Sequence, residues 1–258
     1  MTERRTILVT GGSAGIGAAT ALEAAKLGWR VAVGSRGSER LARSEAALRE
    51  AGAEVFASSL DVSKPESVDA FFDAAEDALG PIDVIVNNAG HSKPSPLHEQ
   101  PASGITAEVG TNLLGALLVT RRGLQSLRRR DLSGDVVFMT SDSVRYPRPG
   151  QVVYGATKAA LENLAEGLSK ELEGTGIRVT TLRIGPTLSE FGSSWELENL
   201  VEQFDYWRPY GMRDARLLGA LLDPADVARA ALHAVCQPRG VLMGTIEIQP
   251  EAPKQPSD

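Results

Sequence analysis

A tyrosine and a lysine stand four residues apart in the segment Tyr154-Gly-Ala-Thr-Lys158. On a helix, this spacing places both side chains on one face. A lysine cation beside a phenol favours the phenolate, so we expect Lys158 to lower the tyrosine pKa from its usual value of ~10. Tyr154 is therefore a candidate proton donor and acceptor at neutral pH.

A serine precedes this pair in the sequence. Ser141 stands thirteen residues before Tyr154, at the end of an apolar run that predicts a buried strand. Parallel sheets open their ligand crevice at the carboxyl ends of their strands. We therefore expect Ser141 to lie at that edge of the sheet.

A glycine-rich turn, Thr10-Gly-Gly-Ser-Ala-Gly-Ile-Gly17, follows the first apolar run of the chain. Glycines at these positions let the backbone approach a pyrophosphate, and the following helix offers free N–H groups and the positive end of its dipole. An ordinary tight turn is the alternative interpretation. The place of the turn between a strand and a helix, at the start of a βα series, favours a dinucleotide site.

These candidate residues are carried by apolar runs of strand length that alternate with longer segments of helical period. The predicted strands are Thr6 to Thr10, Arg30 to Gly34, Glu54 to Ser58, Val84 to Asn87, Val136 to Thr140, Arg178 to Leu182 and Thr245 to Ile248. The predicted helices are Gly15 to Leu27, Glu39 to Ala51, Pro65 to Leu79, Ile105 to Arg129, Val152 to Glu173 and Asp223 to Ala234. Near-continuous Val, Ile and Leu runs are typical of strands buried on both faces. The pattern predicts an α/β fold with a doubly wound parallel sheet of about seven strands and helices on both faces.

Three helix boundaries have local signals. Ser63 is the predicted N-cap of the helix that begins at Pro65, and Gly80 is expected to end that helix. Asp223, followed by a proline, is expected to begin the last long helix.

The composition excludes several function classes. The 258 residues carry 27 Lys and Arg against 33 Asp and Glu, a net charge of −6, which argues against a general binder of nucleic acids or anionic membranes. No apolar run approaches the ~20 residues that cross a bilayer, and the charged start of the chain is unlike a signal peptide. The single cysteine, Cys236, fits a reducing compartment. We expect a cytoplasmic protein without a metal site.

Five motifs occur together in one order and spacing. They are the glycine-rich turn, Asn87-Asn-Ala-Gly90, Asn112-x-x-Gly115, Ser141 and Tyr154-x-x-x-Lys158. In these motifs the chain resembles the classical members of the short-chain dehydrogenase/reductase family over about residues 5 to 250. The resemblance implies a single Rossmann-type domain over 1–250, with a substrate lid at 187–222, and the tail 251–258 is expected to be disordered.

The resemblance also implies the catalytic roles. Tyr154 would act as the general acid and base, and Lys158 would hold the nicotinamide ribose and lower the tyrosine pKa. Ser141 would hydrogen-bond the substrate oxygen, and Asn112 would hold a water of a proton relay. The implied activity is hydride transfer between a nicotinamide cofactor and a carbonyl or secondary alcohol substrate. Ser143 is the alternative serine, but the spacing to Tyr154 favours Ser141.

The cofactor is expected to be NADP(H). An acidic residue at the end of the second strand would bind the ribose 2′-hydroxyl of NAD, whereas this chain has Ser35 and Arg36 there. A solvated Arg36 is the alternative, and Ala14 stands where many NADP-using relatives carry a second basic residue. The expected cofactor-binding residues are Gly11, Ser13, Ala14, Gly15, Ile16, Gly17, Ser35, Arg36, Asp61, Val62, Asn88, Ala89, Gly90, Tyr154, Lys158, Gly185, Pro186 and Thr187.

Two of these assignments have particular reasons. Asp61 and Val62 follow the third strand, where the family binds the adenine, although Asp61 alternatively caps the next helix. Ile184 replaces a customary proline of the family, so we expect a less constrained backbone at Gly185 to Thr187 near the nicotinamide.

The substrate is expected to be apolar or ring-bearing, because six aromatic residues lie in the lid region, with packing as the alternative for any one of them. They are Phe191, Trp195, Phe204, Tyr206, Trp207 and Tyr210. His91, Arg145 and Arg148 border the pocket in this interpretation, and the two arginines are more simply solvated loop charges.

The helices that hold Asn112 and Tyr154 pair with a symmetry mate in relatives, so we expect a homodimer or homotetramer. Two other functions stay open. One is an idle NADP-binding regulatory protein, and the other is an epimerase or dehydratase that uses the same tyrosine and lysine.

Overall fold

The seven strands of the structure form one parallel sheet within the described part of the chain. A computed structural model describes residues 4–188 and 221–251. The strand order is β3-β2-β1-β4-β5-β6-β7, and every neighbouring pair is parallel. The strands are β1 Thr6–Thr10, β2 Arg30–Ser35, β3 Val55–Ser59, β4 Val84–Asn87, β5 Gly134–Ser141, β6 Ile177–Ile184 and β7 Thr245–Ile248. The order reverses between β1 and β4, and the predicted doubly wound sheet is therefore confirmed.

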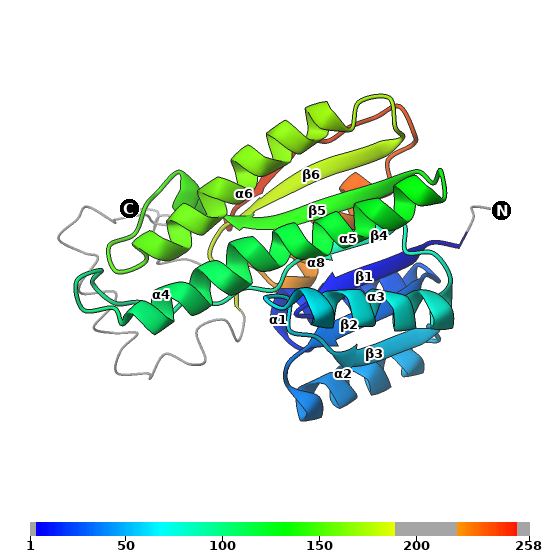
Figure 1. The fold of residues 1–258 in the computed structure, drawn as a ribbon, viewed down its shortest axis with the longest axis horizontal. Coiled ribbons are helices and arrows are strands. Elements are labelled where there is room, and N and C mark those ends of the chain that lie inside the picture. The colour runs from blue at the N-terminus through cyan, green and yellow to red at the C-terminus, as the bar shows by residue number, and fades with distance from the viewer. Residues whose placement is uncertain (1–3, 189–220, 252–258) are drawn as a thin grey trace, which may run out of the picture.

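Helices cover both faces of this sheet (Figure 1). Helices α1, α2 and α8 pack on one face and α3, α5 and α6 on the other. The helices are α1 Gly15–Lys26, α2 Ser38–Glu50, α3 Pro65–Leu79, α4 Ala102–Val109, α5 Gly115–Arg129, α6 Val152–Glu171 and α8 Pro224–Val235. The short helices are η1 Gly110–Leu114, a π-helical turn, and η2 Asp142–Val144, a 3₁₀ turn.

The helices on both faces of the sheet explain why consecutive residues of the strands are apolar. Ile7 and Val9 of β1 belong to the core on the side of α1 and α8, and Leu8 belongs to the core on the side of α3 and α5. Successive strand residues point to opposite faces, so both sets must be apolar when both faces are covered.

Two of the three predicted helix boundaries are confirmed. Gly80 ends α3 with a φ of 82°, and the Asp223 side chain accepts a hydrogen bond from the Ala225 N–H at the start of α8. The prediction for Ser63 is wrong, because Lys64 is the N-cap of α3 and the Ser63 hydroxyl donates to Asp61 Oδ1 at 2.7 Å. A capping hydroxyl would have to accept from one of the first N–H groups of the helix, and among the described residues no side chain does so at α3.

The predicted helix from Ile105 to Arg129 is longer and less regular than expected. It begins at Ala102, and α4 runs through η1 into α5 (Figure 1). By length and composition, Ala102–Arg129 would suffice to cross a membrane, with a mean hydropathy of 1.3 in its most apolar window, of which 28% is buried. The segment is not an unbroken apolar run of ~20 residues, because Thr106, Glu108 and Asn112 interrupt it. Its exposed apolar side chains need another explanation, which is proposed below.

The amino ends of the strands are held together by one buried carboxylate. Asp135, at the start of β5, accepts from Arg5 Nη2 at 2.6 Å and from Arg178 Nε at 2.7 Å, and Arg239 lies 3.5 Å away. Arg178 also donates to the Val235 carbonyl at the end of α8. This cluster ties the segment before β1, the strands β5 and β6, and α8 at the end of the sheet opposite Ser141.

Asp135→Asn is expected to lower the free energy of unfolding by about 3 kcal/mol, because removing one partner of a buried ion pair leaves the other charges uncompensated. Urea denaturation measures this change. The matched control is Glu54→Gln, which breaks an exposed ion pair with Arg4 and is expected to cost less than about 1 kcal/mol. Equal losses in the two variants would contradict the role given to Asp135.

Candidate active site

A threonine hydroxyl joins the ends of β1 and β4 where the strand order reverses. Thr10 Oγ1 accepts from the N–H groups of Asn88 and Ala89, both at 3.0 Å, and donates to the Val86 carbonyl at 3.2 Å. The Asn88 amide returns to β1 by donating to the Thr10 carbonyl at 2.9 Å. A crevice at such a reversal is the usual ligand site of a doubly wound sheet.

The glycine-rich turn lies directly beside this junction. Gly11 and Gly15 have φ angles of 66° and 52°, which favour glycine. A Cβ at Gly17 would overlap the Asn88 amide and the Gly11 carbonyl. Among the described residues no side chain caps α1, and its first turn carries no acidic residue. The turn therefore fits the close approach of an anionic group such as a pyrophosphate.

The end of β2 lies next to this turn. Ser35 Oγ is buried and has no hydrogen-bond partner within the described residues, whereas Arg36 is exposed. The hydrogen bond from Ser63 lowers the pKa of Asp61, and the Arg36 cation acts in the same direction. Burial lowers the pKa of His91, again with a contribution from Arg36. An exposed cation and a hydroxyl without a partner among the described residues, together at one strand end, suit a phosphate.

The tyrosine and the lysine share one face of α6, as predicted. Lys158 Nζ donates to the Met139 carbonyl at 2.8 Å and lies 5.6 Å from the centre of the Tyr154 ring. Burial lowers the pKa of Lys158 to about 8. Burial also raises the pKa of Tyr154 to about 12, and the hydrogen bond with Ser141 opposes that rise. The expected lowering of the phenol pKa by Lys158 is therefore absent in the protein chain as described, because burial outweighs every favourable contact.

Ser141, rather than Ser143, contacts the tyrosine. Its Oγ is hydrogen-bonded to Tyr154, accepts from the Ser143 N–H at 3.1 Å and donates to Asp142 Oδ1 at 3.2 Å. Ser143 Oγ is buried without a partner in the described part of the chain. The spacing argument therefore selects the serine that lies beside the phenol.

Asn112 lies in the π-helical turn between α4 and α5. Its Oδ1 accepts from the His91 N–H, and its Nδ2 donates to the His91 carbonyl, both at 2.9 Å. A Cβ built on Gly90 would lie 3.2 Å from Asn112 Oδ1 and 3.5 Å from Lys158 Nζ. The turn that carries Ala89 and Gly90 is thus held within reach of the lysine.

The segment after β6 is held by contacts with β7 and with Leu222. Ile184 is the buried last residue of β6 and pairs with Ile248, and the Gly185 N–H donates to the Ile248 carbonyl at 2.9 Å. The Thr187 hydroxyl bonds the Gly185 carbonyl, and Thr187 forms a bridge with Leu222. The backbone after β6 is therefore held by β7, whatever constraint the customary proline would add.

Of the two arginines after Ser141, Arg148 is largely buried and is not a solvated loop charge, whereas 58% of the Arg145 side chain is exposed, as expected of a solvated charge. Arg148 forms a two-pronged ion pair with Asp142, and Arg145 pairs with Glu247 at 3.1 Å. Neither ion pair has a local signal in the sequence. The six aromatic residues of the expected lid lie at 191–210, outside the described residues. No three His, Cys, Asp or Glu side chains form a metal-binding group within residues 4–188 and 221–251.

The chain is similar in sequence to known proteins. A family model described as short chain dehydrogenase matches residues 5–199. A serine 3-dehydrogenase of Rhizobium radiobacter is 36% identical over 72% of this chain and 73% of its own. A glycine betaine reductase of Emericella nidulans is 32% identical over 94% of this chain, which spans only 18% of that protein's length.

Solved structures share the fold. A serine dehydrogenase complexed with NADP+ has a TM-score of 0.82 at 26% identity and covers 98% of this chain and 97% of its own. An alcohol dehydrogenase of Thermococcus sibiricus complexed with 5-hydroxy-NADP has a TM-score of 0.81 at 28% identity, covering 99% and 100%. A Burkholderia phymatum short chain dehydrogenase/reductase in complex with NAD, 24% identical and covering 95% and 89%, has a TM-score of 0.82 and shows the fold alone.

The family match begins in the segment before β1 and continues past β6, so it includes the glycine-rich turn, the Asn112 helix, Ser141, Tyr154 and Lys158. With more than half of the sequence matched, this chain belongs to the short-chain dehydrogenase/reductase family of oxidoreductases.

Proposed function

We propose that the protein is an NADP(H)-dependent oxidoreductase that interconverts a carbonyl and a secondary alcohol, with Tyr154 as general acid and base. The observation that carries the proposal is the hydrogen bond between Ser141 and Tyr154 at the carboxyl edge of the sheet, on the same face of α6 as Lys158. The glycine-rich turn and the end of β2 lie along that edge. When bound there, the cofactor supplies or accepts the hydride.

The residues of the chain supply the proton and its placement. With its raised pKa, Tyr154 is protonated at neutral pH and is ready to protonate the alkoxide that forms during reduction. Ser141 positions the substrate oxygen beside the phenol, and the Lys158 cation stabilises negative charge on it. Oxidation needs the deprotonated phenol, so its rate is expected to increase as the pH rises. Asn112 holds the His91 backbone where a relay to solvent would begin.

The preference for NADP(H) rests on Ser35 and Arg36. A 2′-phosphate would satisfy the buried Ser35 hydroxyl and pair with the exposed guanidinium, and β2 ends without a carboxylate that would repel it. Two of the similar structures contain NADP or a derivative of it, whereas one contains NAD. The binding of NADP+ and NAD+ must therefore be compared directly.

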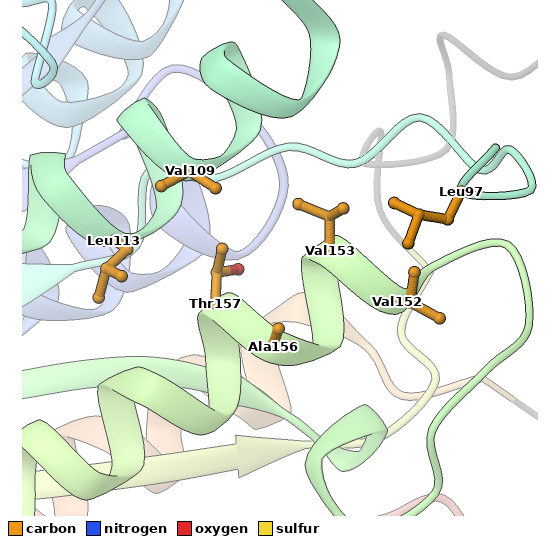
Figure 2. A pocket seen from close by; sticks show the side chains of 7 residues that line it. All are labelled: Leu97, Val109, Leu113, Val152, Val153, Ala156 and Thr157. Carbon is orange, nitrogen blue, oxygen red and sulfur yellow. The ribbon is translucent and has the colours of Figure 1, made fainter. Parts of the chain in front are cut away.

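We further propose that the chain forms a homodimer or homotetramer through α4, α5 and α6. Leu114 at the end of η1, Leu117 of α5 and Val152 of α6 are exposed apolar side chains on this face. An apolar groove of about 380 Å³ runs between the start of α6 and the α4–η1 segment (Figure 2). Figure 2 shows its lining residues, Leu97, Val109, Leu113, Val152, Val153, Ala156 and Thr157. A second copy with the same helices would cover this face.

Tyr154→Phe is expected to reduce turnover by about 100-fold or more, because it removes the proton without removing the ring. The loss of NADPH absorbance with a panel of ketones and aldehydes measures turnover. Tyr146→Phe is the matched control, since Tyr146 is an exposed tyrosine of the neighbouring loop. Full activity in Tyr154→Phe would exclude the proposed acid and base.

Arg36→Ala is expected to weaken NADP+ binding by about tenfold or more and to leave NAD+ binding nearly unchanged, since only NADP+ has the 2′-phosphate. Titration calorimetry gives both dissociation constants. Arg43→Ala, on the exposed face of α2, is the control. The proposed preference fails if the unmodified protein binds both cofactors equally well.

The unmodified protein is expected to have the mass of two or four 27.4 kDa chains in light scattering. Leu114→Glu combined with Leu117→Glu is expected to yield monomers, because the substitutions place charges in a covered apolar interface. Leu27→Glu changes an equally exposed leucine at the end of α1 and is expected to leave the mass unchanged. A monomeric unmodified protein would rule out the proposed interface.

A further inference from the structure

A buried ion pair stands beside the serine and the tyrosine. Asp142 begins η2 directly after Ser141, and Arg148 lies in the loop that leads to α6. Arg148 Nη1 donates to Asp142 Oδ1 at 2.9 Å and Nη2 donates to Oδ2 at 2.7 Å. The side chains are only 10% and 5% exposed. Both carboxylate oxygens are therefore held by one planar guanidinium.

The same carboxylate bonds the serine. Ser141 Oγ donates its single hydrogen to Asp142 Oδ1 at 3.2 Å and accepts from the Ser143 N–H. While the phenol of Tyr154 is protonated, it must be the donor in its bond to Ser141. Once the phenol is ionised, the Ser141 hydrogen must turn away from Asp142 to bond the phenolate. Asp142 and Tyr154 thus compete for one hydrogen, and Arg148 weakens Asp142 as a competitor by occupying both of its oxygens.

The two charges of the pair also act on the phenol in opposite directions. The Arg148 cation lowers the pKa of Tyr154, and the Asp142 carboxylate raises it. Other titratable groups at this edge are Lys158 on α6, Glu108 on α4 and His91 after β4, and of these Glu108 also raises the phenol pKa. A buried ion pair brings little net stability compared with apolar packing. Its place next to Ser141 therefore suggests a role in the reaction.

We propose that Asp142 and Arg148 are positioning residues, which set the direction of the Ser141 hydroxyl and balance the charge around Tyr154 during proton transfer. This inference rests on the proposed function, in which Tyr154 exchanges a proton with the substrate. Neither residue needs to touch the substrate. In this proposal the Arg148 guanidinium binds the Asp142 carboxylate and does not bind an acidic group of the substrate.

The test follows the ionisation of Tyr154 directly and needs no substrate. The chain has four tyrosines, so protein labelled with ¹³C at tyrosine Cζ gives few signals, and Tyr154→Phe assigns the one of interest. Signal positions at about pH 11, with circular dichroism to confirm folding, report the ionised fraction. With a pKa of about 12, about one tenth of Tyr154 is ionised in the unmodified protein.

The two single variants are expected to shift this fraction in opposite directions. Asp142→Asn removes the negative charge, and a shift of ~1 pH unit raises the ionised fraction to about one half. Arg148→Gln leaves Asp142 unopposed, and an equal shift lowers the fraction to about one hundredth. The double variant and Arg148→Lys, which keeps the cation, are both expected to stay near the unmodified value. A merely structural pair would not produce shifts of opposite sign.

Shifts in the same direction, or no shift in either variant, would overturn the inference. Asp142→Asn is isosteric, so if Arg148→Gln does not fold, the absence of an upward change in the ionised fraction of Asp142→Asn alone overturns it. The proposed function has a separate test. Activity in Tyr154→Phe would refute the acid and base role of Tyr154, and it would leave the phenol titrations of the Asp142 and Arg148 variants as they are.

Discussion

The contact between the Thr10 hydroxyl and the turn after β4 is the constraint on which the site depends. A parallel sheet of this order must send its chain in opposite directions from β1 and from β4, which leaves a gap between their carboxyl ends. Thr10 Oγ1 and the Asn88 amide cross this junction with five hydrogen bonds to backbone groups. They place the glycine-rich turn against the segment of Ala89 and Gly90. The segment after β4 in turn positions Asn112, whose π-helical turn faces Lys158.

Burial is the second constraint, and it acts on both Tyr154 and Lys158. The phenol of Tyr154 and the ammonium of Lys158 are both shifted toward their neutral forms, because each loses hydration at this edge. Ionising either side chain therefore costs free energy unless a group of opposite charge or a hydrogen bond compensates for the lost hydration. For the phenol, the hydrogen bond with Ser141 and the Arg148 cation partly offset that cost, whereas the Asp142 carboxylate adds to it.

Much of the fold could be predicted from the sequence, because burial on both faces leaves unbroken apolar runs such as β1 and β4. The shared helix face of Tyr154 and Lys158 was predictable because a spacing of four residues determines a helix face. The Ser63 hydroxyl bonds a carboxylate two residues earlier instead of capping α3. Two features were not predictable: the π-helical turn at Asn112 and the pairing of Arg148 with Asp142. Each depends on contacts between segments that only the folded chain brings together.

A crystal structure with NADP+ bound would test the central claim most directly, namely that one edge of the sheet holds both the cofactor and the proton donor. The account predicts the pyrophosphate against Gly11 to Gly17, the 2′-phosphate against Ser35 and Arg36, and the nicotinamide ribose beside Tyr154 and Lys158. Cofactor bound elsewhere, or a nicotinamide that lies away from the Tyr154 hydroxyl, would contradict it.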